Sequence, residues 1–296
     1  MIVRQTKEIP TNYVYGIGGG VACLFVAIFM FRGMLVPTVT PSCEQRYMNG
    51  VRFSFARQSG DPLTAAELQG KLAGLDWGLN ENVHMRKIEQ GPAPVVLEID
   101  LETPHIAGSE AIDTGRSGMG FVWQPRSLQT ASAGCLSYNV WVPQDFSYGR
   151  GGVLPGLSGE EKVVAATDNS EERQSKPFAT RIRWNADGTL AVVPITQDWN
   201  KGKVVPLADL KLERGRWTRI DQEVILNTAG EADGGLRVWV NGVLGLEVGD
   251  MIYRGDAQQK MNAVNVDIHF ADDELKWTPA LKNTKLRMSP IELRMQ

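Results

Sequence analysis

The sequence predicts an all-β fold, an antiparallel β-sandwich, and three observations support this. From Val95 onward, short runs of alternating apolar and polar residues follow one another. Turn-forming residues separate these runs, and the 31 glycines and 15 prolines are spread along the 296 residues without a period. A hydrophobic content of 43% supplies enough apolar material for a sizeable core. These features exclude a collagen-like or low-complexity chain.

The chain begins with a segment that predicts a single membrane anchor. Tyr13–Phe31 carries no charged residue, and the apolar stretch continues beyond Arg32, so residues 13–36 meet the length of a transmembrane helix. A cleaved signal peptide is the alternative. The apolar run is longer than a usual signal core, however, and no cleavage site of small residues follows it.

The orientation of this anchor rests on two arguments, because the positive charges on its two sides nearly balance. Residues 1–12 have the length of a short cytoplasmic tail, and the motifs of the C-terminal domain, given below, also favour a place outside the cytoplasm. We therefore expect a single-pass protein of the inner (cytoplasmic) membrane with its C-terminal domain in the periplasm or exterior. Gly16 and Gly20 form a GxxxG pair, which predicts association with a partner transmembrane helix or a second copy. A generic glycine-rich span is the alternative reading.

Residues 37–60 are expected to form a linker and a first strand, and residues 61–296 the β-domain. A short helix opens after Pro62, because Thr64 and Glu67 have the spacing of a capping box. An apolar stripe to about Leu75 would pack this covering helix on the sandwich edge.

The later elements are strands bounded by turns. Asn241-Gly242 is the clearest turn, because this dipeptide accepts the positive φ angles of a type I′ hairpin. We expect strands over Gly50–Ala56, Val95–Leu101, Gly118–Gln124, Leu136–Val142, Thr180–Trp184, Leu190–Ile195, Trp217–Leu226, Leu236–Val240, Asn262–Phe270 and Ile291–Arg294.

Composition argues against several kinds of function. The net charge of −3 gives no support to nucleic-acid binding. The chain has only 3 histidines, and it lacks a CxxC motif, so we expect no metal site. No motif implies a cofactor, since Gly16–Gly20 lies within the predicted span and is not a dinucleotide loop.

Two of the 3 cysteines lie in the part expected to be exported. Outside the cytoplasm, Cys43 and Cys135 are a reasonable disulfide pair, and two separate buried thiols are the alternative. Cys23 lies inside the predicted span.

Two motifs carry a resemblance to a known family. Gly151–Gly159 reads GGVLPGLSG, and Phe178–Trp184 reads FATRIRW. Both resemble the signature of polysaccharide lyase family 14, whose members cleave alginate and glucuronan and have a concanavalin-like jelly roll. The likeness covers about Gly118–Phe270, with Gly215–Gly242 best preserved.

The resemblance also implies which reactive positions are changed. The family has a lysine where Val153 stands, a serine where Ala179 stands, and two tyrosines where Val193 and Ile195 stand. Of that set only Arg181 is kept. An acidic cluster at residues 272–274 replaces two family glycines, and would either repel a polyuronate or form a solvated loop.

The candidate ligand-binding residues are Arg181, Arg183 and Tyr148. The two arginines point to one face of a strand. Tyr148 and His269 could replace the missing proton carriers, although an ordinary loop tyrosine and strand histidine are the alternatives. Arg181 could equally pair with a buried acid.

These observations favour a membrane-anchored, exported lyase-like protein without catalytic activity, which binds a possibly acidic polysaccharide or serves as a scaffold. An active lyase with a rearranged site is one alternative. An accessory subunit of a membrane complex, docked by the glycine-rich helix, is the other.

Overall fold

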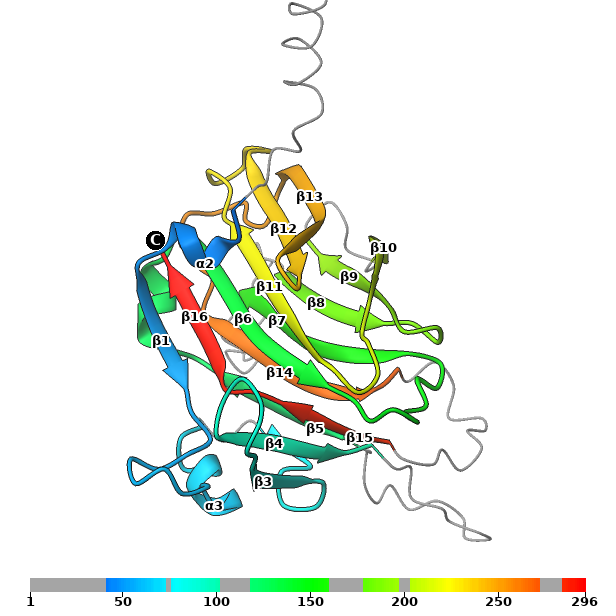
Figure 1. Ribbon diagram of the computed structural model, residues 1–296. Coiled ribbons are helices and arrows are strands. Elements are labelled where there is room, and N and C mark those ends of the chain that lie inside the picture. The colour runs from blue at the N-terminus through cyan, green and yellow to red at the C-terminus, as the bar shows by residue number, and fades with distance from the viewer. Residues whose placement is uncertain (1–40, 73–75, 102–117, 160–177, 197–202, 272–283) are drawn as a thin grey trace, which may run out of the picture. The chain divides into compact units, whose positions relative to one another are not determined.

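Two antiparallel sheets form the part of the chain from Pro41 to Gln296 (Figure 1). The computed structural model describes residues 41–72, 76–101, 118–159, 178–196, 203–271 and 284–296. The predicted tail and anchor, with Gly16 and Gly20, lie outside the described residues, as does the acidic cluster at 272–274. Within the described ranges, no helix is long and apolar enough to cross a membrane.

The larger sheet has nine strands. Its main path runs β13 (Val243–Met251), β12 (Gly234–Val240), β11 (Trp217–Ile225), β6 (Ala133–Trp141), β15 (Lys285–Met288), β4 (Val95–Asp100) and β3 (Val83–Lys87). The last strand, β16 (Ile291–Met295), pairs with β6 on one side and with β1 (Asn49–Phe53) on the other.

The smaller sheet has seven strands. Their order is β10 (Val205–Lys211), β9 (Thr189–Ile195), β8 (Phe178–Trp184), β7 (Gly152–Gly159), β14 (Ala263–Phe270), β5 (Met119–Trp123) and β2 (Asp76–Trp77). Figure 1 shows β14 beside β7, although more than a hundred residues separate them in sequence.

The core between the sheets confirms the predicted β-sandwich and the phase of its best strands. In β14, Val264, Val266, Ile268 and Phe270 are all buried, so the residues between them face the other way. The turn between β12 and β13 also matches its prediction, since Asn241 and Gly242 have φ angles of 51° and 79°.

The short helix α3 spans Ala65–Gln69 and has the expected capping box. The Thr64 hydroxyl accepts from the backbone N–H of Glu67, and the Glu67 carboxylate accepts from that of Thr64 at 2.7 Å. The helix is shorter than its apolar stripe indicated. It ends at Gly70, because glycine is a poor helix former. Leu68 alone within α3 is buried.

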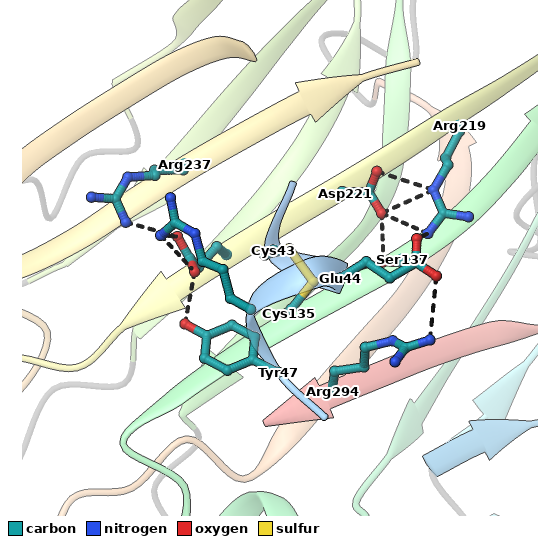
Figure 2. Close-up of a disulfide and its surroundings, with 11 residues drawn as sticks. Cys43, Glu44, Tyr47, Cys135, Ser137, Arg219, Asp221, Arg237 and Arg294 are labelled. Atoms are coloured by element: carbon teal, nitrogen blue, oxygen red, sulfur yellow. Dashed lines mark hydrogen bonds and ion pairs between the residues drawn. A yellow bond between two sulfur atoms is a disulfide. The ribbon is translucent and has the colours of Figure 1, made fainter. Parts of the chain in front are cut away.

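A disulfide fixes the first described residues to the larger sheet, as predicted. Cys43 in the one-turn helix α2 (Cys43–Arg46) is bonded to Cys135 in β6 (Figure 2). The helix lies against β6 and β11 on the side of the sheet away from the main core. The bridge therefore anchors the segment that leads in from residue 40.

Charged residues around α2 reinforce this attachment. Glu44 accepts from Arg219 at 2.6 Å and from Arg294 at 3.2 Å (Figure 2). Arg46 lies 3.2 Å from the fully buried carboxylate of Glu223. Buried charges are stable only when they are paired and hydrogen-bonded in this way.

Tyr47 completes the set of partners around Glu223. Its hydroxyl donates to the carboxylate at 2.7 Å, and Arg237 binds the same carboxylate at 2.9 Å. Burial, together with the hydrogen bond to Glu223, raises the pKa of the Tyr47 phenol well above its ordinary value. Tyr47 thus remains a hydrogen-bond donor at any physiological pH.

Candidate functional site

The residues that the family resemblance singles out lie on one face of the seven-stranded sheet. In β8, Thr180, Ile182 and Trp184 are fully buried against the core. Arg181 and Arg183 therefore point to the opposite side of the sheet, which we call the outer face. The expectation that the two arginines share a face is thus met by the strand geometry.

Strand pairing gathers the substituted positions around Arg181. Val193 in β9 is its direct neighbour, and Ala179 pairs with Ile195 one step along the same two strands. On the other side, Val153 in β7 pairs with Arg183. Ala179, Val193 and Ile195 are thus neighbours on one side of Arg181, and Val153 lies across β8 from Val193 and Ile195, beside Arg183. These positions are where the resemblance puts the reactive groups of the family.

Arg181 pairs with an acid, which was one of the alternatives, although the sequence did not identify which acid. Its guanidinium lies 2.9 Å from the carboxylate of Asp267 in β14, with the two side chains 39% and 19% exposed. The ion pair crosses β7, where Gly156 pairs with both Arg181 and Asn265. Gly156 has no side chain to stand in the path between β8 and β14.

Trp77 lies next to Asp267, on the short strand β2. It pairs with Gly120 of β5, which in turn pairs with Asp267. A Cβ atom on Gly120 would lie 2.1 Å from Nε1 of Trp77 and 2.4 Å from Oδ1 of Asp267. Only glycine leaves room for both groups, so a half-buried indole and a carboxylate meet over this position.

His269 also lies on the outer face, two residues along β14 from Asp267. Its ring is 5.8 Å from that of Trp77, in an edge-on arrangement. Nδ1 is 2.6 Å from the carbonyl oxygen of Phe270, which only accepts, so Nδ1 carries the hydrogen. In β7 the residue opposite His269 is Val153. Of the two residues considered as replacement proton carriers, Tyr148 and His269, only His269 lies on this face.

Tyr148 lies elsewhere. It is buried in the core, where its hydroxyl donates to the carbonyl of Leu212 and its ring packs edge-on against Phe146. The guanidinium of Arg214 covers the ring at 4.6 Å. Burial raises the pKa of the Tyr148 phenol, which opposes its use as a base. The structure thus brings Arg181 and Arg183 together on one face and places Tyr148 apart from them.

Two buried polar atoms beside the ion pair have no hydrogen-bond partner among the residues that the structure describes. They are Nε of Arg181 and Oδ1 of Asn265, two residues that flank Gly156 in adjacent strands. Such atoms are uncommon in folded proteins and destabilise the fold unless something else satisfies them. The region around Gly156 is therefore not optimised for stability alone.

The described part of the chain contains no cluster of three or more histidine, cysteine, aspartate or glutamate side chains that could hold a metal ion. The chemistry that the outer face offers is that of one ion pair, a second arginine, a histidine, an indole and a set of apolar side chains.

Comparison with known proteins agrees with this fold. The family model described as polysaccharide lyase 14 matches residues 96–287. The marine alginate lyase of that family from Aplysia kurodai has 19% sequence identity and a TM-score of 0.62, and the match covers 84% of this chain and 99% of that one. Alginate lyase vAL-1 from Chlorella virus has 16% identity and a TM-score of 0.55 over 73% of this chain and 90% of that one.

A third similar structure is alginate lyase Aly36B, with 14% identity and a TM-score of 0.59, covering 83% of this chain and 96% of that one. Variants of Aly36B have been solved in complex with an alginate trisaccharide and tetrasaccharide. At these identities the likeness shows the fold alone. No curated protein matches the sequence.

Proposed function

Because the chain belongs to the polysaccharide lyase 14 family, we propose that it is a membrane-anchored, exported member that binds polysaccharide without cleaving it. The binding surface is the outer face of the seven-stranded sheet. The observation that carries this proposal is the environment of Arg181. Its strand neighbours are apolar at the positions of the family tyrosines, and its charge is taken up by Asp267.

Binding, as distinct from catalysis, needs only shape and hydrogen-bonding groups. The outer face offers an indole, two arginines, an aspartate and a histidine on a sheet, and well-placed polar groups of this kind fix the orientation of a ligand. The fold by itself leaves the function open, since one fold hosts binders and enzymes alike. The residues of the face are what favour a binder.

Loss of Arg181 tests this proposal. The full-length chain, purified in a mild detergent, is passed over sensors that carry alginate, glucuronan or the carboxyl-reduced form of each. We expect at least one polymer to bind, and Arg181→Ala to weaken that binding about fivefold to tenfold, because a charged hydrogen-bond donor is lost.

The matched control is Arg216→Ala, since the Arg216 side chain is 78% exposed and lies immediately before β11 of the other sheet. It should leave binding unchanged. If no polymer binds, or if both variants behave alike, the binding proposal is wrong and a scaffold role takes its place.

The membrane anchor is part of the same proposal. Residues 13–36 form one span, with residues 1–12 in the cytoplasm, and the Gly16–Gly20 pair is the contact for a second helix. The Cys43–Cys135 disulfide supports export of the domain, because such bridges persist in oxidising compartments.

Fractionation and proteolysis test the anchor and its orientation. The chain should stay in the membrane pellet after carbonate or high-salt washing, and only detergent should release it. A protease added to the periplasmic side should digest the protein beyond about residue 36. Release by carbonate would remove the anchor from the proposal, and protection of the domain would reverse the orientation.

A rearranged lyase is the second candidate function, and one observation favours it. His269 lies on the same face as Arg181 and carries its hydrogen on Nδ1, which leaves Nε2 able to accept a proton. The lyase measurements described below decide between the two.

A further inference from the structure

We propose that the sugar bound over Arg181 is uncharged, so that the ligand of this protein is a neutral polysaccharide rather than a polyuronate. This inference rests on the proposed binding function and names its ligand class. It departs from the alginate and glucuronan that the lyases of this fold cleave. The reason is that the protein's own carboxylate, Asp267, is already paired with Arg181, the cation that a uronate would need.

The geometry of the ion pair is the first step. Arg181 and Asp267 reach each other from strands on either side of β7 and meet at 2.9 Å. The pair is only partly exposed, so it is screened by water less than a surface pair would be. A second carboxylate brought to Arg181 would have to share one guanidinium with Asp267, and two carboxylates at one site repel each other.

The surrounding charges do not relieve this repulsion. Among the described elements of the sheet, β5, β7 and β9 carry no charged residue, and Val153 stands where the family resemblance implies a lysine. On β14 the only ionisable residue besides Asp267 is His269. The remaining cation, Arg183, is engaged in an interaction of its own. The described strands β5, β7, β8, β9 and β14 thus carry two arginines and one aspartate, so they offer at most one uncompensated positive charge to a chain with one carboxylate per sugar.

The same groups suit a neutral sugar well. A hydroxyl both donates and accepts, so adjacent hydroxyls can donate to the carboxylate of Asp267 and accept from the guanidinium of Arg181. Trp77 lies beside Asp267 over Gly120 and offers an indole on which the apolar side of a sugar ring can pack. An ion pair beside an aromatic ring is therefore complementary to a sugar that carries only hydroxyl groups. The carboxylate of Asp267 repels a sugar that carries a carboxylate of its own.

The test compares ligands that differ only in charge. Oligosaccharides from alginate and from glucuronan are each used before and after reduction of their carboxyl groups to alcohols. The affinities are measured with the full-length chain in detergent at about 20 mM salt, where screening is weak. The affinity for the reduced ligands should be higher than that for the parent uronates by about fivefold or more.

Asp267→Asn provides the decisive variant, because it keeps the shape and removes the charge. It should raise affinity for the uronates about fivefold, and about 0.5 M salt should abolish that gain. Adding Arg181→Ala to Asp267→Asn should also abolish it. The matched control is Asp250→Asn in β13 of the other sheet, which makes the same change in net charge and should alter no affinity. Unchanged thermal midpoints show that each variant is folded.

The outcomes separate this inference from the function on which it rests. If the native chain prefers the uronates and Asp267→Asn does not improve their binding, the neutral-ligand inference fails while polysaccharide binding stands. If neither the parent nor the reduced ligands bind, the binding proposal fails, and the inference fails with it.

Discussion

The full-length chain should release no measurable unsaturated sugar from alginate or from glucuronan. The assay follows the rise in ultraviolet absorbance that the unsaturated sugar end produces, with the alginate lyase from Aplysia kurodai as the positive control. We expect the native chain to remain at the background rate under conditions where that enzyme finishes its reaction.

The physical reason is that elimination needs three things at one sugar. A base must take the proton next to the uronate carboxyl, a cation must neutralise that carboxyl, and an acid must protonate the leaving oxygen. At the family tyrosine positions, Val193 and Ile195 cannot move protons, and Val153 cannot supply a charge. Arg181, which is the one cation kept from the family's reactive set, is paired with Asp267 at 2.9 Å.

The expected size of the effect follows from losses of this kind. Removing one preorganised donor typically lowers a rate about 10²–10³-fold, equivalent to roughly 3–4 kcal/mol. Such losses are not additive when the groups act as a unit, but several of them still leave a very slow enzyme.

Two variants identify the source of any activity that is found. A clear rise in absorbance that Arg181→Ala and His269→Ala each abolish would overturn the binding proposal in favour of a rearranged lyase. Activity that survives both substitutions points to a contaminating lyase. A converse variant combines Val153→Lys, Ala179→Ser, Val193→Tyr and Ile195→Tyr with Asp267→Asn. If it gains activity over the native chain, these positions are confirmed as the site of the lost chemistry.

How far the sequence predicts this protein depends on how local each signal is. The alternation in β14 and the Asn241-Gly242 turn were predicted correctly, because burial of one face and the φ angles of a hairpin leave a mark within a few residues. The bounds of strand β13 were not predicted, although Leu244, Leu246 and Val248 alternate in it, because these apolar residues are only partly buried and two glycines interrupt the pattern.

The site was predicted only in part, for a related reason. Alternation within β8 is enough to put Arg181 and Arg183 on one face. The partner of Arg181, in contrast, comes from β14, across an intervening strand, and no spacing in the sequence reports that neighbourhood. The alternation in β14 does put Asp267 on the outer face, and that was the one available signal.

Trp77 and Tyr148 are two further residues whose positions in the fold cannot be predicted from the local sequence. Trp77 lies on a two-residue strand, too short for any periodicity, and reaches the outer face only because Gly120 makes room. Tyr148 follows a strand in a loop, where sequence does not tell an inward side chain from an outward one. Its burial and its hydrogen bond to Leu212 are consequences of tertiary packing.

The Cys43–Cys135 bridge was predicted from compartment and number alone, yet the ion pairs around it were not. Asp221 and Glu223 look like the polar face of β11, and both are almost fully buried. They are covered because α2 lies against that strand. Arg46 of α2 pairs with Glu223, whereas Asp221 pairs with Arg219 of its own strand, which in turn binds Glu44 of α2. The disulfide therefore holds α2 against the sheet, and the ion pairs of α2 depend on that position.

Replacing both cysteines by serine should lower the free energy of unfolding by about 2–4 kcal/mol. A disulfide that closes a loop of this length, with a sequence separation of 92, restricts the unfolded chain strongly. Its removal also allows α2 to leave the sheet, which would take Arg46 and Tyr47 away from the buried Glu223. For a domain of this size the thermal midpoint should fall by roughly 5–15 °C.

The measurement is thermal unfolding of the full-length chain in detergent, followed by tryptophan fluorescence, with and without a reducing agent. The native chain should lose stability on reduction and then match the Cys43→Ser/Cys135→Ser variant, which itself should not respond. Cys23→Ser is the matched control and should behave as the native chain does. Mass spectrometry of non-reduced peptides should recover the two cysteines linked. Free thiols at both positions, or equal midpoints for the native chain and the double variant, would show that the bridge does not hold this face of the sheet together.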